Sequence, residues 1–213
     1  MKTPTILAVR KLMLSKGYQF FEKGPFNLNI IGIRSASSKS NQFDDLLLLI
    51  YKDNVGTWNM NVFPITTDPG KPYLMQPLSQ AGTAILVPGQ YAGAYKLGIH
   101  GRSKPAHKQY TALEQQKPMR YVRDKNRDAV VDTTLYADEK NLFWDNIKSN
   151  IHRGNPGWLS KLGYRYLVNN YSAACQVFQY ADHFDQFIDL CRTSAILYNN
   201  SFTYTLLEES DFS

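Results

Sequence analysis

The stretch Asp45-Leu-Leu-Leu-Leu-Ile-Tyr-Lys52, followed by Asp53-Asn54-Val55-Gly56 and then by Thr57-Trp-Asn-Met-Asn-Val-Phe-Pro-Ile65, decides the fold. Each flanking run has the length and the residue types of a β-strand. The connection between them joins Asp and Asn to glycine, which is a strong signal for a hairpin. We therefore expect two antiparallel strands here, and a mainly β chain around them.

Strand patterns continue on both sides of this hairpin, and two helices are expected beside them. The expected strands are 26–33, a strand and turn within 82–91, then 94–100, 110–113, 119–122 and 202–207. A short amphipathic helix is expected over 5–18, and a second over 182–192, where acids stand in the first turn and an arginine in the last. The fold class is therefore mainly β, with a β-sandwich or mixed sheets, a short N-terminal helix and one amphipathic helix.

The length and composition fit one globular domain. At 213 residues the chain can bury one sizeable core. Hydrophobic residues make up 43% and charged residues 20%, which is ordinary for a folded protein. The 14 tyrosines and the frequent Gly and Pro turn signals favour β-structure over a helical bundle. We expect residues 1–24 to form an N-terminal helical extension and residues 25–213 to form a single core.

Cysteine use and hydropathy indicate where the protein is made. The two cysteines do not amount to a disulfide framework. The apolar part of the N-terminus is too short, and is interrupted too early by charge, for a secretory signal. No segment reaches the roughly 18 apolar residues of a membrane span. We expect synthesis in the cytoplasm without a signal peptide, and thiols that start reduced.

The chain is basic, with a net charge of +6, and its cations gather in residues 102–127. A solvated basic face is one interpretation of this stretch. The other is a surface for an anionic partner, such as a cell-wall polymer or nucleic acid. Nucleic acid is disfavoured because the sequence has no recognition helix, zinc finger or aromatic-basic RNA motif.

One acidic stretch partly matches a calcium-binding loop. Asp124, Asn126, Asp128 and Asp132 occupy positions one, three, five and nine of that pattern. Alanine stands at the sixth position, where the pattern needs glycine, and leucine stands at the twelfth, where it needs a bidentate glutamate. The favoured alternative is a turn whose acids are solvated or form salt bridges with neighbouring arginines. We therefore expect no metal site and no cofactor.

A histidine and a cysteine carry the strongest chemical signal. His152 lies in the segment 150–154, and Cys175 lies among small residues in the segment 171–178, directly ahead of the second expected helix. A thiol becomes a good nucleophile when imidazole or a helix N-terminus favours its ionised form. We therefore expect Cys175 to be a nucleophile and His152 its base. Cys191 lies on the apolar stripe of the helix and is expected to be a buried thiol.

Two alternatives stay open for this pair. Cys175 also fits a buried strand residue, and His152 a loop residue, with no chemical role for either. A rival base is His100, which stands in the sequence Ile99-His100-Gly101 but lies far upstream of the cysteine.

These motifs resemble those of the L,D-transpeptidase catalytic domain of the YkuD type. The sequence Asn-Ile-His-Arg-Gly at 150–154 is similar to the Gly-Ile-His-Gly-Thr of that family, and Ser-Ala-Ala-Cys at 172–175 is similar to its Ser-His-Gly-Cys. The segment 63–70 is similar to the strand and loop that carry the family's Ser-Thr-Gly and Thr-Pro-x-Gly elements. The resemblance covers about residues 27–207, and it implies the sheet arrangement of that family.

The resemblance implies a mechanism and assigns residues to it. Cys175 would form a thioester with a cell-wall stem peptide, and His152 would be the base. The backbone carbonyl of Arg153 would orient the imidazole, and the backbone N–H of Ala174 would help to hold the oxyanion. The substrate-binding residues that it implies are Tyr171, Ser172, Gly154 and Gln176.

The chain departs from the family pattern at three positions. Ala173 stands where the family has its second histidine, Ala174 where it has glycine, and Val177 where it commonly has Arg or Asn. These changes affect the substrate pocket and the turn that would hold the oxyanion, because alanine resists the positive φ that glycine adopts. They leave the histidine and cysteine themselves in place.

The expected partner is bacterial peptidoglycan. The chain is also similar to proteins encoded by tailed phages of Bacteroidetes, which implies an endolysin or a virion-associated protein, and favours hydrolysis of the wall over crosslinking. The protein would then be carried in the particle or released to the periplasm and cell wall at lysis. The alternative is a catalytically degenerate relative that keeps the fold and binds the wall or other virion proteins.

Overall fold

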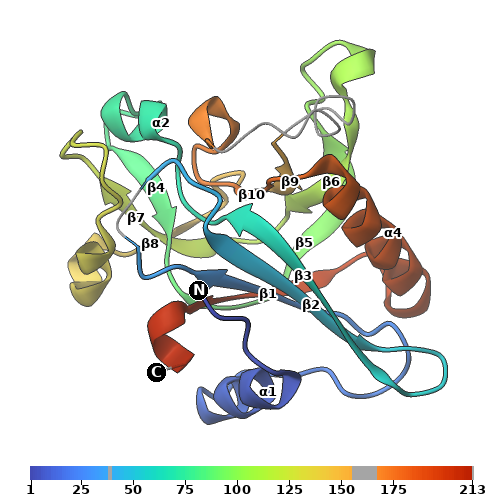
Figure 1. The fold of residues 1–213 in the computed structure, drawn as a ribbon. Helices are drawn as coiled ribbons and strands as arrows, with labels where there is room; N and C mark the ends of the chain where they lie inside the picture. The colour runs from blue at the N-terminus through green and yellow to red at the C-terminus, as the bar shows by residue number, and fades with distance from the viewer. Residues whose placement is uncertain (38–39, 155–166, 213) are drawn as a thin grey trace.

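The computed structural model describes residues 1–37, 40–154 and 167–212. Eight strands close into a barrel in the order β1-β11-β5-β6-β9-β10-β3-β2, and three form a separate sheet in the order β4-β7-β8 (Figure 1). The barrel is mixed, because β1 pairs parallel with β11 and β9 pairs parallel with β10, while its other pairs are antiparallel. The prediction of a mainly β fold with mixed strand pairing is confirmed.

The strands are β1 Asn29–Arg34, β2 Asp45–Lys52, β3 Trp58–Thr66, β4 Thr83–Leu86, β5 Gly89–His100, β6 Tyr110–Gln115, β7 Met119–Asp124, β8 Phe143–Asp145, β9 Ile151–Arg153, β10 Gln176–Phe178 and β11 Phe202–Glu208. The α-helices are α1 Ile6–Ser15, α2 Lys71–Met75 and α4 Ala181–Tyr198. Short 3-10 helices are η1 Ala106–Lys108, η2 Thr133–Ala137, η3 Glu139–Asn141, η4 Asn169–Tyr171 and η5 Glu209–Phe212.

The hairpin predicted over 45–65 is present, and its turn explains the register. Strands β2 and β3 pair from Asp45 opposite Ile65 to Lys52 opposite Trp58. The side chain of Asp53 accepts the backbone N–H groups of two residues within the turn, at 3.0 and 2.9 Å. This turn fixes the pairing, so the apolar positions of the two strands face the same core.

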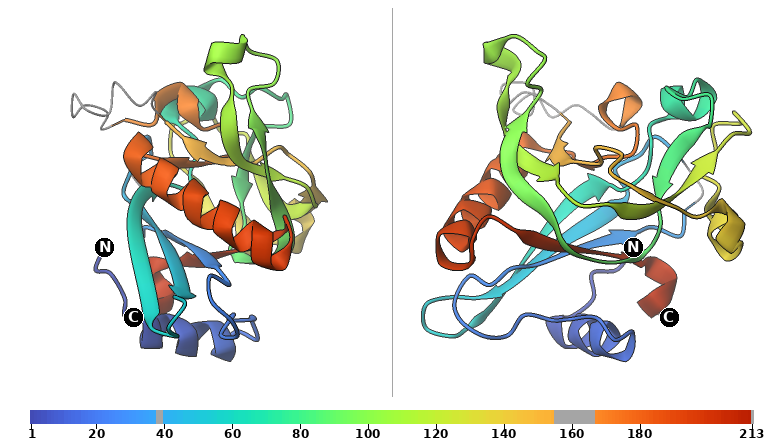
Figure 2. Two further views of the ribbon diagram at one scale, coloured as in Figure 1. Left: turned by 90° about the vertical axis from the view of Figure 1, so that its right-hand side faces the viewer. Right: turned by 180° about the vertical axis from the view of Figure 1, so that it is seen from behind.

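The four consecutive leucines of β2 are explained by burial on both faces. Leu47 and Leu49 point into the barrel core, where α4 adds a stripe of apolar side chains. Leu48 and Ile50 point outward, where Val9 and other residues of α1 cover them. Figure 1 shows α1 beneath β1 and β2, and the left view of Figure 2 shows α4 lying across the strands. A strand that is buried on both faces loses the polar alternation of a half-exposed one.

A buried arginine joins the barrel to the small sheet. Arg34, at the end of β1, is 2% exposed. Its guanidinium donates to the carbonyl of Leu86 in β4 at 2.9 Å and to the carbonyl of Thr67 at 3.1 Å, and it pairs with Asp68 at 2.9 Å. A second buried carboxylate, that of Asp45, accepts the N–H of Thr67 at 2.6 Å. One cation therefore pairs with a buried acid and joins two sheets, and a second buried acid lies close by, bonded to the same Thr67.

Two expectations about local structure were wrong. Cys175 is not directly ahead of a helix, because the short strand β10 separates it from α4. The second helix is longer than 182–192 and runs over Ala181–Tyr198, but its cysteine, Cys191, is buried in the core as predicted.

None of the helices in the described residues has the length and hydrophobicity needed to span a bilayer.

Candidate active site

The parallel pairing of β9 with β10 brings the histidine motif to the cysteine motif. In this pairing His152 lies opposite Val177, and the N–H of Gln176 donates to the carbonyl of Asn150 at 2.9 Å. Cys175 comes directly before β10 and stands two residues from Val177, the partner of His152 in this register. Diagonal neighbours of this kind stand about 7–8 Å apart at their backbones, within reach of a long side chain.

The imidazole of His152 is buried and oriented by a backbone carbonyl. The residue is 4% exposed, and its Nδ1 lies 2.9 Å from the carbonyl oxygen of Arg153. The hydroxyl of Tyr110 donates to the same oxygen at 3.3 Å. Because a carbonyl only accepts, Nδ1 carries the hydrogen of the neutral ring in this contact, and the ring has a further backbone contact with Tyr171. This carbonyl is the one expected to orient the base.

Burial keeps this imidazole neutral. Burial, together with the nearby His100 ring, lowers the pKa of His152 to about 3, although the backbone contacts with Arg153 and Tyr171 oppose the shift. An uncharged imidazole at neutral pH is the form that accepts a proton.

The rival base lies in the same cluster. The ring of His100, at the end of β5, stacks on that of His152 with 4.3 Å between centroids and 20° between planes. In the barrel order, β6 separates β5 from β9, whereas β9 is the immediate neighbour of β10. His152 is therefore the histidine on the strand next to Cys175. His100 lies one strand further away and contacts His152 through its stacked ring. Burial also lowers the pKa of His100.

The turn that carries Cys175 is fixed by side chains on both sides. The hydroxyl of Ser172 donates to the carbonyl of Cys175 at 2.8 Å, and that of Ser149 donates to the carbonyl of Ala174 at 2.6 Å. The thiol itself donates to the carbonyl of Lys148 at 3.6 Å. Burial raises the pKa of the thiol to about 11, although a backbone contact with Asn150 opposes the rise.

The resting pair is therefore a neutral thiol beside a neutral imidazole. Among the residues that the structure describes, no hydrogen bond joins the thiol to the imidazole, and the thiol is directed to Lys148 instead. A helix N-terminus next to a thiol would stabilise the thiolate. Cys175 has no helix N-terminus next to it, because α4 begins only after β10. Catalytic hydrogen bonds are often completed only when substrate binds, so the geometry leaves a catalytic pair available.

A cavity of about 290 Å³ opens beside the thiol. Its walls come from the cysteine turn, the segment after β8, the small sheet and the region of α2. Its lining includes Cys175, Ala174, Tyr121, Arg123, Asp145 and Lys148. A cavity of this size accepts part of a peptide.

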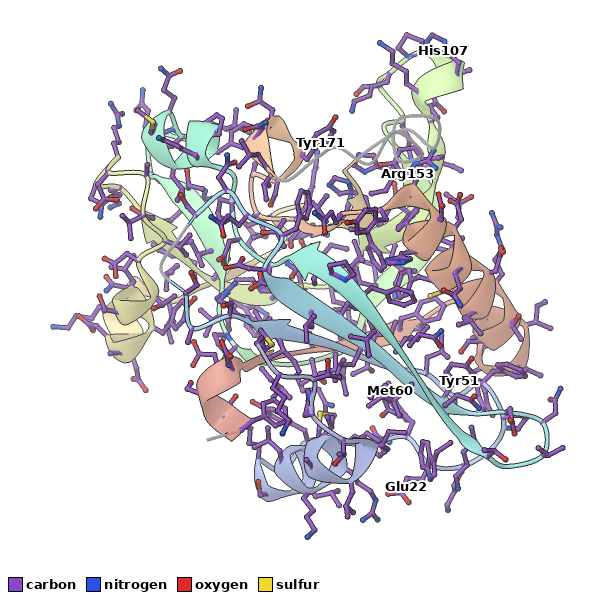
Figure 3. The ribbon with its side chains drawn as sticks, viewed as in Figure 1. Glu22, Tyr51, Met60, His107, Arg153 and Tyr171 are labelled. Carbon is purple, nitrogen blue, oxygen red and sulfur yellow. The ribbon has the colours of Figure 1, made fainter. Side chains whose placement is uncertain are left out.

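The residues expected to bind substrate occupy different places. Ser172 and Gln176 are fully buried, and their side chains bond within the protein: Ser172 to Cys175, and Gln176 to Tyr204 at 2.9 Å. The N–H of Gly154 donates to the carbonyl of Phe178 at 2.9 Å. Tyr171 ends the short helix η4, and Figure 3 labels it at the same end of the barrel as Arg153. Of these residues, Ser172, Gln176 and Gly154 have contacts that hold the site in shape.

The cavity residues were not predicted as a group. Arg123 belongs to the basic stretch noted in the sequence, and Lys148 stands just before the histidine motif, but nothing in the sequence brings them together. The Gly/Pro/Tyr-rich span between the two motifs, residues 155–166, lies outside the described residues.

The acidic loop is a series of turns. Asp124 accepts the N–H of Asn126, Asn126 accepts that of Asp128, and Asp128 accepts that of Val130, at 2.8 to 3.2 Å. Within the described part of the chain, no group of three or more His, Cys, Asp or Glu side chains has a geometry that could hold a metal ion. The turn interpretation of this stretch therefore fits the structure.

Comparisons of the chain with protein-family models, with curated proteins and with solved structures found no match.

Proposed function

We propose that the chain is a cysteine-dependent enzyme that cleaves cell-wall stem peptides, with Cys175 as nucleophile and His152 as base. The observation that carries this proposal is the parallel pairing of β9 with β10, which brings the strand of His152 next to the segment of Cys175, and Cys175 lines a cavity. The resemblance of the two motifs to those of L,D-transpeptidases supplies the substrate class.

The first step is acyl transfer to sulfur. The thiol turns from the carbonyl of Lys148 to the imidazole of His152, which gives up its contact with Tyr171 and takes the thiol proton as sulfur attacks the peptide carbonyl. The carbonyl of Arg153 holds Nδ1–H and stabilises the imidazolium that forms. The imidazolium then gives its proton to the leaving amine as the peptide C–N bond breaks, and this leaves a thioester.

Backbone donors serve the developing oxyanion. Among the described residues, the N–H groups of Ala174 and Cys175 donate to no protein acceptor, so both are available. A donor of this kind lowers the barrier by about 3 kcal/mol. Alanine in place of the family's glycine keeps the N–H.

Water resolves the thioester in this proposal. His152 activates the water, the C–S bond breaks, and the carboxylate product leaves with the thiol restored. The similarity to phage proteins favours this hydrolysis over attack by a second stem amine, because hydrolysis opens the wall. The protein would act from the particle or after release at lysis.

A second candidate is a binding protein that keeps the fold without the chemistry. The thiol bonded to Lys148 and the raised pKa of Cys175 favour it. Such a protein would dock on the wall or on another virion protein through its basic residues.

The test is digestion of purified peptidoglycan, followed by mass analysis of the released peptides, with Cys175→Ala and His152→Asn as variants. Cys191→Ala is the matched control, because it removes the other cysteine, which lies in the core. We expect release by wild type and by the control only. Equal release by Cys175→Ala contradicts the proposal. Wall binding by wild type without any release favours the second candidate.

A further inference from the structure

Ser149 is a buried hydroxyl that the proposed reaction leaves without a role. The residue is fully buried, and its hydroxyl donates to the carbonyl of Ala174 at 2.6 Å. In the described structure Lys148, Ala174 and Cys175 line the cavity beside the thiol, whereas Ser149 does not. A buried hydroxyl that bonds to the backbone next to a candidate nucleophile fixes the shape of that backbone.

The backbone around Ser149 is anchored independently of the cysteine turn. Its N–H donates to Oε1 of Gln115, at the end of β6, at 2.9 Å. The N–H of Gln115 donates in turn to Oδ1 of Asn150 at 3.0 Å. These two bonds hold residues 149 and 150 against β6, so the hydroxyl of Ser149 is a fixed donor to which the cysteine turn is attached.

The bond from Ser149 sets the direction of the Cys175 N–H. No peptide bond in the described residues is cis, and in a planar trans peptide the C=O and the following N–H point in opposite directions. Because the carbonyl of Ala174 points to the buried Ser149, the N–H of Cys175 points away from it, on a peptide whose two residues line the cavity. Gln176 is a weaker second donor to this carbonyl, since its Nε2 lies 3.4 Å away.

The neighbours of Ser149 contact the sulfur of Cys175 through their backbone. The carbonyl of Lys148 accepts the thiol at 3.6 Å, and a backbone contact with Asn150 favours the ionised form. The hydroxyl of Ser149 therefore joins the segment that holds the sulfur to the peptide that carries the Cys175 N–H.

We propose that Ser149 is a positioning residue for acyl transfer to Cys175: its hydroxyl holds the Ala174–Cys175 peptide so that the Cys175 N–H faces the developing oxyanion. This inference rests on the proposed function, because it concerns the oxyanion of the same reaction. Without the hydroxyl, the Ala174 carbonyl keeps only the long bond from Gln176, and the peptide is free to turn. A reaction of the thiol that forms no oxyanion does not need Ser149.

The first experiment compares two reactions of the Cys175 thiol. p-Nitrophenyl acetate acetylates it: an oxyanion forms as sulfur attacks, His152 takes the thiol proton, and the ester C–O bond breaks to release nitrophenolate. Iodoacetamide alkylates it by displacement of iodide, and no oxyanion forms. The ratio of the two rates, measured by mass analysis of the Cys175 peptide, cancels the ionisation of the thiol.

We expect this ratio to fall about tenfold or more in Ser149→Ala, since removal of one oxyanion donor costs about 100- to 1,000-fold in rate. Ser149→Thr keeps the hydroxyl and should restore the ratio to near the wild-type value. Ser194→Ala, which removes another buried hydroxyl on α4, is the matched control and should not change the ratio.

The second experiment needs no reactive thiol. Labelling with ¹³C at the alanine carbonyl and ¹⁵N at cysteine marks a single peptide, because Ala174–Cys175 is the only Ala-Cys pair in the sequence. A hydrogen bond deshields a carbonyl carbon, so the NMR signal of this carbon should move upfield in Ser149→Ala. In Ser149→Thr and Ser194→Ala it should stay near its wild-type position.

The outcomes separate the two proposals. An unchanged ratio in Ser149→Ala overturns the positioning role, and the proposed enzyme stands. An equal fall in Ser149→Ala and Ser194→Ala also overturns it, because the effect is then a general loosening of the fold. Reaction of wild-type Cys175 with neither reagent overturns the proposed enzyme, while the carbonyl signal still decides whether Ser149 fixes this peptide.

Discussion

Replacing His152 by asparagine should remove a large acid sensitivity from the protein. The imidazole is 4% exposed, and burial lowers its pKa from 6.5 to about 3. Between these values the unfolded chain binds a proton that the folded chain does not, so stability is lost as pH falls from about 6.5 towards 3. Since one pKa unit corresponds to 1.36 kcal/mol, the loss is about 2 kcal/mol at pH 5 and about 3 kcal/mol at pH 4.

Asparagine suits this test because its side-chain N–H can still donate to the carbonyl of Arg153, and it does not titrate. Urea unfolding at pH 7, 5 and 4 gives the free energy of unfolding of each protein. As pH falls from 7, the free energy of unfolding of wild type should decrease more than that of the variant, by about 2 kcal/mol at pH 5 and about 3 kcal/mol at pH 4. His107, which is exposed on the hairpin between β5 and β6 (Figure 3), provides the control His107→Asn.

Groups that titrate in both proteins, such as the buried acids beside Arg34, contribute equally to the two free energies of unfolding, so their effect cancels in the difference. The difference also contains the interaction of His152 with His100, whose ring stacks on it and whose own pKa is lowered by burial. Parallel curves for wild type and His152→Asn between pH 7 and 4 would refute the view that the fold holds this imidazole neutral.

Three further measurements test the fold and the thiol. Arg34→Met should cost about 3–5 kcal/mol in urea unfolding, because it leaves buried carboxylates without their cation; an unchanged midpoint would contradict this. Gly82→Ala should cost at least about 2 kcal/mol, since φ is +101° and a Cβ would meet the carbonyl of Asp124 at 2.2 Å; Gly17→Ala, with φ +72° and open space, should cost about 1 kcal/mol. Alkylation of Cys175 by iodoacetamide should rise about tenfold per pH unit from 8 to 10, because burial raises the pKa of the thiol to about 11, and a plateau below pH 8 would show the opposite shift.

The parts of the fold that the sequence predicts are those specified by neighbours along the chain. The hairpin over 45–65 follows from a turn motif between two strand patterns, and β2 begins and ends where expected, at Asp45 and Lys52. The helix α4 follows from its apolar stripe and its first-turn acid. The sequence does not predict that the sheet closes, because closure depends on the parallel pairing of β1 with β11, which lie at opposite ends of the chain.

Of the candidate site, only the histidine and the cysteine were predictable from the sequence. Strands β9 and β10 have three residues each, which is too short for a period to be seen. Their pairing is also non-local, so the sequence could suggest that His152 and Cys175 meet but not how. Arg123 and Lys148 reach the cavity from different segments, and Arg34 joins two sheets from the end of one strand. Residues that come together from separate segments of the chain leave no local pattern in the sequence.

The neutral resting pair restricts how the reaction can proceed. With the thiol pKa at about 11 and the imidazole pKa at about 3, moving the proton before attack would cost up to about 11 kcal/mol. A turnover of one per second corresponds to a barrier of about 17 kcal/mol. The free energy needed to form the ion pair before attack would be most of that barrier. Proton transfer must then accompany the attack of sulfur on a carbonyl already in place. Binding of the substrate in the cavity beside Cys175 would hold the carbonyl there, so reactivity towards small reagents should underestimate reactivity towards substrate.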